Sequence, residues 1–586
     1  MTRPRFLAIV GVADLGSTRA VIQAAERDHG LMLVLQAGQV QVLASPAMQA
    51  IAIGPGQGVA LGTLFDAGGE AAGDHSVART TALPSGPTKA LLETHWGSYV
   101  AISADRETST VEVLRDPSGG VGCYLRRKDR VVFLFDDVGL AKALGLITGE
   151  PDPAGVVQSL AYPHPRDTRT GLVGVEEVLP GTAIAVSPNG QVTRAYAWTP
   201  GRFTLSRLQF SDAGAAAKAV RAQTQRGVSA WAKDHRSIVL ELSGGLDSSI
   251  VAACLSDRAD DLHLVTLVTP DPGADERDYA QAVAQGVGAP LRVLNLDVAK
   301  SRLEPQQLLT ARPRGGLLHR LIDGVLTSYA EEVSADGFFS GGGGDNVFCY
   351  LATAAPATDV LLRQGPGPAF LKAVADLAAL HGCTVWEAGA LAIRKAWRPP
   401  ASRPPQSDFL ALDAAPSPPE PHPWLAWPGL PPGRREHLFS LVAVQRSLFD
   451  HDREMIAPIR FPLLSQPLVE LCLRIPSWMW IAGGQDRAVA RAAFADLLPP
   501  SVLQRRTKGD FMGLLGALYS KHRPDLIPLL LDGWLAQNRL IDRHGIETYL
   551  RSTAPVSDFR FYRLLELANV ELWARSWLAT AVIRAN

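Results

Sequence analysis

The sequence predicts a two-domain protein of mixed α/β and α+β class, in which a sheet-rich first domain precedes a domain built on a parallel sheet. Residues 1–205 contain short β-type runs broken by Gly, Pro and Asp, such as 31–35, 99–102 and 131–135. Residues 206–586 carry long Ala-rich helical segments that alternate with apolar strands, which is the pattern of βαβ units.

The elements of each domain follow from the same patterns. In the first domain, helices are predicted over 17–28 and near residue 141. In the second domain, four apolar runs are predicted to form the parallel sheet, namely 238–242, 262–268, 291–296 and 337–339. Ligands of such sheets bind beyond the carboxyl ends of the strands, so residues that directly follow these runs are the first candidates for a site.

Charge and composition exclude several classes of function. The 586 residues include 57 Lys and Arg against 58 Asp and Glu, which gives no sign of a nucleic-acid or membrane-surface partner. No segment is long and apolar enough to span a bilayer, and the amino terminus lacks the apolar core of a signal peptide. The five cysteines are far apart, as expected of buried thiols in a reducing compartment. We therefore expect a cytoplasmic protein.

The stretch from Ser243 to Ser249, with the sequence SGGLDSS, lies between the strand 238–242 and a predicted helix. Two glycines permit a tight turn, and the N–H groups of the helix start form an anion site together with the hydroxyls. The Lys of a Walker A loop is absent. The stretch resembles the PP-loop of ATP pyrophosphatases, a HUP-like fold that holds the β- and γ-phosphates while ATP is cut between its α- and β-phosphates.

A second glycine cluster, Ser340-Gly341-Gly342-Gly343-Gly344-Asp345, follows the strand 337–339. Asp247 and Asp345 are thereby predicted to lie at the same edge of one sheet. Mg²⁺ binds one or two carboxylates together with phosphate oxygens and water, so these two residues are the predicted metal ligands. The residues predicted to contact ATP and pyrophosphate are Leu242, Ser243, Gly244, Gly245, Asp247, Ser248, Ser249, Val268, Ser340 and Gly341.

Several motifs together resemble the synthetase domain of asparagine synthetases. They are the SGGLDSS loop, Asp275-Glu276-Arg277-Asp278-Tyr279-Ala280, the loop from Gly341 to Asp345, Arg460-Phe461-Pro462-Leu463-Leu464, and Arg505-Arg506-Thr507-Lys508-Gly509. The first domain resembles class II glutamine amidotransferases through 96–99 and 114–119. The resemblance implies an Ntn-hydrolase-like αββα sandwich followed by a PP-loop domain with helical additions, and implies ATP and Mg²⁺ as cofactors.

Two departures from that family bear on function. Its glutaminase domains begin with a nucleophilic cysteine, but here Leu7 stands in the matching strand and no cysteine precedes Cys123. Glutamine hydrolysis is therefore not expected, and we interpret the first domain as degenerate. Asparagine synthetases also carry Glu where this chain has Gly342, and β-lactam synthetases carry Tyr there. The missing side chain is predicted to leave room for a larger substrate.

The glycine-rich loop, the Pro-rich segment 398–434 and the Arg-Arg-Thr-Lys-Gly-Asp-Phe run are similar to lasso-peptide macrolactam synthetases. Residues 399–432 contain twelve prolines and are interpreted as an insertion or lid. The resemblance implies a lasso precursor core peptide as substrate, with a leader peptidase and a leader-binding protein of the same pathway as partners. A side-chain carboxylate would be adenylated, and the peptide's α-amine would then close the ring.

Lys508, with Asp247 and Asp345, completes the predicted catalytic set, because the family's Lys-Gly motif places a cation near the reacting phosphorus. Arg460, Arg487 and Arg491 are candidates for contacts with phosphate or carboxylate. Two alternatives remain open: an amide ligase of the asparagine synthetase or β-lactam synthetase type that acts on a small molecule, and a non-catalytic scaffold.

Overall fold

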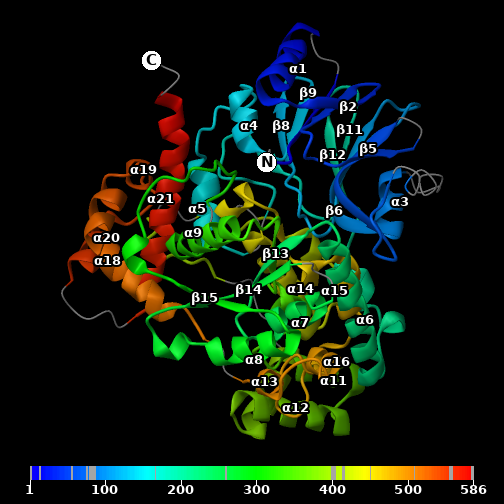
Figure 1. The fold of residues 1–586 in the computed structure, drawn as a ribbon, viewed down its shortest axis with the longest axis vertical. Coiled ribbons are helices and arrows are strands. Elements are labelled where there is room, and N and C mark those ends of the chain that lie inside the picture. The colour runs from blue at the N-terminus through cyan, green and yellow to red at the C-terminus, as the bar shows by residue number, and fades with distance from the viewer. Residues whose placement is uncertain are drawn as a thin grey trace.

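The first domain is a sandwich of two antiparallel sheets, drawn in blue and cyan in Figure 1. The computed structural model describes residues 3–11, 15–54, 57–73, 77, 87–164, 167–257, 261–313, 315–397, 404–411, 416–448, 451–506, 509–552 and 558–582. One six-stranded sheet has the order β10 (Glu176–Glu177), β8 (Tyr124–Lys128), β9 (Val131–Phe135), β1 (Phe6–Val10), β3 (Val40–Ala44), β2 (Met32–Ala37). The other six-stranded sheet has the order β12 (Val192–Tyr196), β11 (Thr182–Val186), β7 (Val111–Arg115), β6 (His95–Ala104), β5 (Gly58–Asp66), β4 (Ala50–Ile53).

Strand β1 shows why these sheets are covered on both faces. Phe6, Ala8 and Val10 lie in the core that the two sheets share. Leu7 and Ile9 point to the opposite face, since successive side chains of a strand alternate, and pack in a second core. That second core includes residues of α1 (Leu15–His29), α4 (Val138–Ala143) and α5 (Pro153–Ala161), while α3 (Pro87–Thr94) packs against β6 of the other sheet.

The second domain is built on a five-stranded parallel sheet with the order β15 (Leu291–Asn295), β14 (Asp261–Val268), β13 (Ser237–Glu241), β16 (Gly337–Ser340), β17 (Ile459–Arg460). On one face, Ile238 and Leu240 pack in a core with α6 (Ala213–Ala232), α7 (Leu246–Leu255) and α8 (Arg277–Val287). On the other face, Val239 packs with α9 (Leu317–Glu332). The central strands β13 and β16 are buried on both faces, which explains why they are continuous apolar runs in the sequence, whereas the edge strand β15 is partly exposed.

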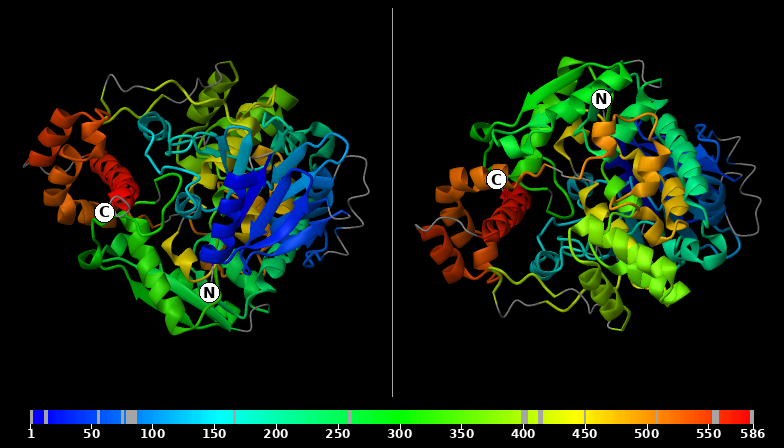
Figure 2. Two further views of the ribbon diagram at one scale, coloured as in Figure 1. Left: turned by 90° about the horizontal axis from the view of Figure 1, so that it is seen from above. Right: turned by 90° about the horizontal axis from the view of Figure 1, so that it is seen from below.

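Helices make up most of the remaining chain. After β16, the chain up to residue 503 forms the helices α10 (Gly344–Val347), α11 (Ala355–Gln364), α12 (Pro368–His381), α13 (Val385–Trp397), α14 (Pro432–Val444), α15 (Gln466–Leu473), α16 (Ala488–Ala493) and α17 (Pro500–Leu503). The C-terminal group consists of α18 (Met512–Leu531), α19 (Trp534–Gln537), α20 (Arg543–Arg551) and α21 (Arg560–Val582). Both views of Figure 2 place this orange-red group on the side of the molecule away from the blue sheets.

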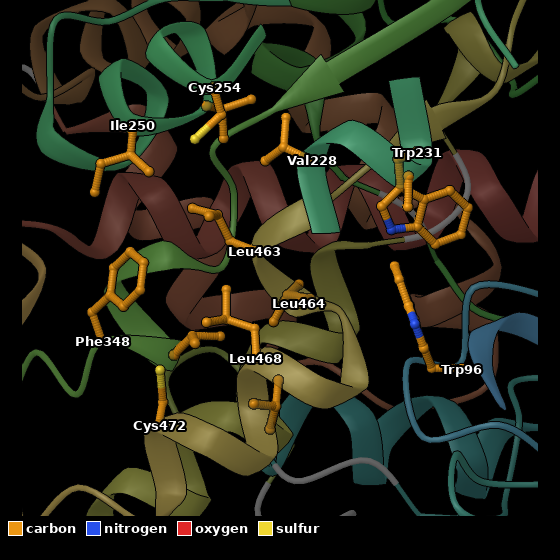
Figure 3. Packing of buried hydrophobic residues seen from close by; sticks show 14 of the residues in the cluster. Trp96, Val228, Trp231, Ile250, Cys254, Phe348, Leu463, Leu464, Leu468 and Cys472 are labelled. Carbon is orange, nitrogen blue, oxygen red and sulfur yellow. The ribbon is translucent and has the colours of Figure 1, made fainter. Parts of the chain in front are cut away.

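The two domains share hydrophobic cores. Phe65 and Trp96 of the first domain pack against Trp231 of α6, with ring centroids of Phe65 and Trp231 5.0 Å apart. Figure 3 shows Trp96 and Trp231 in the same cluster as Leu463 and Leu464. Because removing a buried aromatic side chain costs about 3–5 kcal/mol, contacts of this kind fix the first domain firmly on the second.

The structure confirms the predicted fold class. The runs predicted as strands coincide with β2, β6, β9 and β13–β16, and the predicted helices coincide with α1 and α4. Strand β17 was not predicted, because two residues carry no periodic pattern. Across the described residues, no helix combines the length and apolar content needed to cross a bilayer.

The described parts of the Pro-rich segment 398–434 are anchored by three contacts. The peptide N–H of Gln406 donates to the carbonyl of Ala161 on α5, and Leu410 bridges to Ile541 near α20. Further along, Trp424 is buried against Trp198 of the first domain, with ring centroids 4.9 Å apart. The segment thus connects the first domain to the C-terminal helices, and its role as a lid stays a prediction.

Candidate active site

The predicted nucleotide-binding residues converge at the carboxyl edge of the parallel sheet. Leu242 and Ser243 directly follow β13, while Val268 and Ser340 end the neighbouring strands β14 and β16. The strands are in parallel register, with Glu241 paired to Val265 on one side and to Ser340 on the other. A cavity of about 350 Å³ opens at this edge.

The loop after β13 presents hydroxyl and N–H groups around the start of α7. The Ser243 Oγ lies 3.1 Å from the Ser248 Oγ and accepts a hydrogen bond from the Gly245 N–H. The Ser249 hydroxyl donates to the Gly245 carbonyl at 2.7 Å, which fixes the first turn of the helix. The positive end of the α7 dipole therefore faces the cavity, as an anion site requires.

The second glycine loop packs directly against the first, and only glycine allows this approach. A Cβ on Gly341 would lie 2.5 Å from the backbone N of Ser248, and a Cβ on Gly344 would lie 2.3 Å from Cγ of Asp247. The sequence pattern of two glycine loops about a hundred residues apart is therefore explained by their contact in space.

Asp247 and Asp345 converge on one cation, the guanidinium of Arg487. Its Nη1 lies 3.2 Å from Oδ2 of Asp247 and also contacts Oδ1 of Asp345. Burial alone would lower the pKa of Arg487, but the coulombic effect of Asp247, Asp345 and Asp486 outweighs burial and raises it. Arg487 itself has a left-handed backbone (φ 50°), an unusual conformation for a residue with a side chain.

The two carboxylates fit the predicted Mg²⁺ site, because Arg487 already places a positive charge between them. In the part of the chain that is described, no cluster of three or more His, Cys, Asp and Glu side chains offers a complete set of protein ligands for a metal. Two carboxylates that complete their coordination with phosphate oxygens and water are the usual arrangement for Mg²⁺. Arg487 would have to move from Asp247 and Asp345 for the ion to bind there.

A third wall of the cavity comes from the segment that precedes α18. Arg505 pairs with Glu276 and stacks over the Tyr279 ring, with its guanidinium 4.1 Å from the ring centroid. Glu276 also accepts a hydrogen bond from the Gly509 N–H at 3.0 Å. Lys508, the predicted catalytic lysine, lies outside the described residues, but Arg506 and Gly509 on either side line the cavity.

Most predicted residues line this cavity, namely Leu242, Ser243, Gly245, Asp247, Ser248, Ser340, Gly341 and Asp345. Gly244, Ser249 and Val268 are not among the lining residues. Ser249 and Val268 are buried behind the loop and the strand end, and on β14 the wall is formed by Val265, Thr266 and Leu267.

Of the three candidate arginines, Arg487 and Arg491 line the cavity. Arg460 lies elsewhere: its guanidinium stacks over Trp231, 4.8 Å from the ring centroid, and burial lowers its pKa to about 10. Glu276 belongs to one of the motifs that carry the family resemblance, but no role in the site was predicted for it. Its position at the start of α8 already accounts for an acidic residue through the helix dipole, so no local pattern marks its contact with Arg505.

The first domain shows no reactive thiol at the position that the family resemblance singles out. Leu7 is fully buried between Leu43 and Phe135 of the neighbouring strands. Cys123 is also fully buried, and burial raises the pKa of its thiol to about 12, which makes it a poor nucleophile.

Comparison with known proteins agrees with this site. Residues 219–575, more than half of the chain, match the profile of the asparagine synthase family. A carboxyethyl-arginine beta-lactam-synthase from Streptomyces clavuligerus is 26% identical over 257 residues, a match that covers 39% of this chain and 49% of that protein. The chain thus matches about half the length of this curated relative.

Two solved structures are also similar. One is described as the allosteric regulatory enzyme of purine biosynthesis, with 8% identity, a TM-score of 0.23, and coverage of 50% of this chain and 80% of that chain. The other is a glutamine phosphoribosylpyrophosphate amidotransferase from B. subtilis complexed with ADP and GMP, with 10% identity, a TM-score of 0.21, and coverage of 52% of this chain and 69% of that chain.

Proposed function

From the premise that this chain belongs to the asparagine synthase family, a family of ATP-dependent carbon–nitrogen ligases, we propose that it is a macrolactam synthetase that acts on a lasso precursor core peptide. The observation that carries the proposal is the convergence of Asp247, Asp345 and the loop from Ser243 to Ser248 on one cavity. These groups suit a triphosphate with a bound cation.

In the first step, a side-chain carboxylate oxygen of the peptide forms a bond to the α-phosphorus of ATP. The bond between that phosphorus and the β-phosphate oxygen breaks, which gives an acyl-adenylate and pyrophosphate. The Ser243 and Ser248 hydroxyls and the N–H groups at the start of α7 would hold the departing pyrophosphate. Mg²⁺ held by Asp247 and Asp345 would neutralise the charge that develops on the phosphates.

In the second step, the α-amine of the same peptide forms a bond to the activated carbonyl carbon. The bond from that carbon to the AMP oxygen breaks, the amine nitrogen loses a proton, and an isopeptide ring closes. The reference pKa of an α-amine is about 7.7–8.0, so a substantial fraction is already neutral near pH 7. The main task of the protein is therefore to hold both ends of the peptide near each other.

Gly342 leaves less free space in the cavity than we predicted from its lack of a side chain. It lines the cavity, but the direction of a Cβ there is closed by the Phe461 ring, whose Cδ1 and Cε1 would lie 3.1 Å away. Room for a large substrate must come from another part of the molecule.

The proposal is tested by incubating the purified protein with ATP, Mg²⁺ and a leader-free synthetic core peptide, taken from the precursor gene expected beside the gene of this protein. The expected result is a product lighter than the peptide by one water molecule, with one AMP and one pyrophosphate formed per product. Unchanged peptide mass in the presence of both cofactors contradicts the proposal.

The match to a beta-lactam-synthase supports a second candidate, an amide ligase that acts on a small molecule. Both candidates form AMP. They are distinguished by the substrate that stimulates AMP formation: a small amino acid in the second case, the core peptide in the first. A scaffold without catalytic activity would form AMP with neither.

A further inference from the structure

A second, larger cavity of about 710 Å³ lies beside the nucleotide cavity. Its walls come from three parts of the chain that are far apart in sequence. Leu160 of α5 belongs to the first domain, Gln406 to the Pro-rich segment, and Leu565 to α21 of the C-terminal helices. Figure 1 shows α5, α9 and α21 beside one another at this place. We refer to this cavity as the chamber.

The chamber adjoins the nucleotide cavity through shared elements. On α9, Ile322 lines the nucleotide cavity and the next residue, Asp323, lines the chamber. Phe511 lines the nucleotide cavity, and Leu515, one turn further along α18, lines the chamber. A molecule that fills the chamber is therefore adjacent to the place where ATP is expected.

Buried ion pairs cross the wall between the two cavities. Glu241, at the end of β13, lines the nucleotide cavity, and its Oε1 lies 2.5 Å from Nη1 of Arg453. The Nε of Arg453 lies 3.5 Å from Oδ1 of Asp323, which in turn lies 3.5 Å from Nδ1 of His451 in the chamber wall. The Arg453 and Asp323 side chains at the centre of this network are almost completely buried, and their pairing fixes the relative position of the two walls.

The chamber lining has the chemistry expected for a peptide. Arg560 and Asp408 provide both signs of charge, and Phe559 and Tyr562 are aromatic side chains that are 73% and 44% exposed. The His319 side chain is accessible within the chamber. A single-sign charge would indicate a phosphate or a metal, whereas mixed charge with aromatic surface suits a chain with an amine, a carboxylate and apolar side chains.

We propose that the chamber binds the peptide whose carboxylate is activated in the nucleotide cavity, and that the first domain, the Pro-rich segment and α21 together form its recognition surface. This inference rests on the proposed function. It assigns the first domain a role in substrate binding, through α5, in place of glutamine hydrolysis.

Two glycines on or next to α9 provide a matched pair of variants for a test. Gly316 lines the chamber, and a Cβ on it would meet no atom within 4 Å. Gly324 lies on the same helix, is exposed, does not line either cavity, and also has open space around its Cβ position. Gly316→Trp therefore places an indole in the chamber, whereas Gly324→Trp places the same group outside it.

The probe is a pool of short synthetic peptides with a free amino terminus, an internal Asp or Glu, and a carboxy-terminal fluorophore. Binding is measured by fluorescence anisotropy, and ATP affinity is measured by calorimetry to verify that each variant is folded. We expect Gly316→Trp to weaken peptide binding about tenfold or more, or by at least ~1.4 kcal/mol. Gly324→Trp should bind like the wild type, and all three proteins should bind ATP equally.

A photo-crosslinking peptide pool provides a measurement on the unmodified protein. Crosslinks to α5, α9 or α21 support the chamber, whereas crosslinks confined to other surfaces overturn it. Equal peptide binding by the wild type and Gly316→Trp, or no binding by the wild type, also overturns it. AMP formation is measured separately: peptide that binds in the chamber without forming AMP contradicts the proposed function and leaves the chamber assignment standing.

Discussion

Two strand-end turns of this molecule look alike in sequence and differ in what their polar groups do. The turn from Arg115 to Gly119 follows β7 in the first domain, and the loop from Ser243 to Ser249 follows β13 in the second. Each contains an aspartate, a serine and a glycine. In the first domain these groups are bonded to one another inside the protein, and in the second domain they face a cavity.

In the first-domain turn, Arg115 and Asp116 are almost completely buried. The Arg115 guanidinium donates to the Glu177 carboxylate at 2.9 Å and to the carbonyls of Val121, Val178 and Gly119. Asp116 accepts hydrogen bonds from the N–H groups of Tyr99, Ser118 and Gly119. A turn whose charged groups are bonded in this way contributes to stability and presents little to a ligand.

In the second-domain loop, Asp247 is paired with the Arg487 side chain, and the Ser243 and Ser248 hydroxyls line the cavity. The difference shows that turns of similar sequence can serve stability in one domain and line a cavity in the other. Substitutions in the two turns should therefore have different effects. In the first-domain turn they should lower stability, and in the second-domain loop they should lower activity.

The largest effect is expected for Arg115→Met. It leaves the buried Glu177 carboxylate with fewer partners, and breaking a buried ion pair costs about 3–5 kcal/mol. Urea unfolding should report this loss of stability, while AMP formation per folded molecule stays unchanged. A loss of AMP formation at unchanged stability would mean that the first-domain turn has kept a direct role in the reaction.

Asp247→Ala should have the opposite effect: activity should fall while stability stays unchanged. It removes one of the two carboxylates at the predicted Mg²⁺ site, and losing one preorganised electrostatic group typically costs about 10²–10³ in rate. Pyrophosphate release should fall by that factor, while the urea midpoint stays near that of the wild type. Release within tenfold of the wild type would exclude Asp247 from the site.

Lys508→Ala should lower cyclised product about a hundredfold, because the predicted role of this cation is to stabilise the transition states. ATP affinity, measured by calorimetry, should change little. Lys372→Ala provides the matched control, since Lys372 is exposed on α12 and pairs with Asp376 on the same helix. Equal product yields from the two variants would show that Lys508 is not catalytic.

The smallest effect concerns pH. Burial raises the pKa of Asp116 to about 6 in the folded protein, against an ordinary value near 3.9 when unfolded. Between about pH 4 and pH 6 the folded state therefore holds more protons, and the free energy of unfolding falls as pH rises. Asp116→Asn should remove this contribution, on the order of 1 kcal/mol per pH unit. Identical pH profiles of urea unfolding for wild type and variant would contradict the assignment.

Much of the fold could be predicted because its strands are strongly patterned. The run Val131 to Phe135 coincides with β9, and the apolar runs of the second domain coincide with its four longer parallel strands. The convergence of Asp247 and Asp345 could also be predicted, since parallel strands bring their carboxyl ends to one edge.

Other parts of the site depend on contacts that no local pattern encodes. Arg487 pairs with Asp247, 240 positions away, and Arg505 pairs with Glu276, 229 positions away. The chamber is assembled from α5, α9, α21 and the Pro-rich segment, each of which has an ordinary structural reason for its sequence. Packing in three dimensions decides such sites, and a pattern read along the chain cannot reveal them.

The central claim, that a peptide carboxylate is adenylated by ATP, is tested most directly by isotope transfer. The core peptide is synthesised with ¹⁸O in its Asp or Glu side-chain carboxylate and incubated with the protein, ATP and Mg²⁺. The account predicts that AMP acquires one ¹⁸O atom per cyclised peptide, because the carboxylate oxygen bonded to phosphorus leaves with AMP. Cyclised peptide accompanied by unlabelled AMP, or by ADP with labelled phosphate, would contradict it.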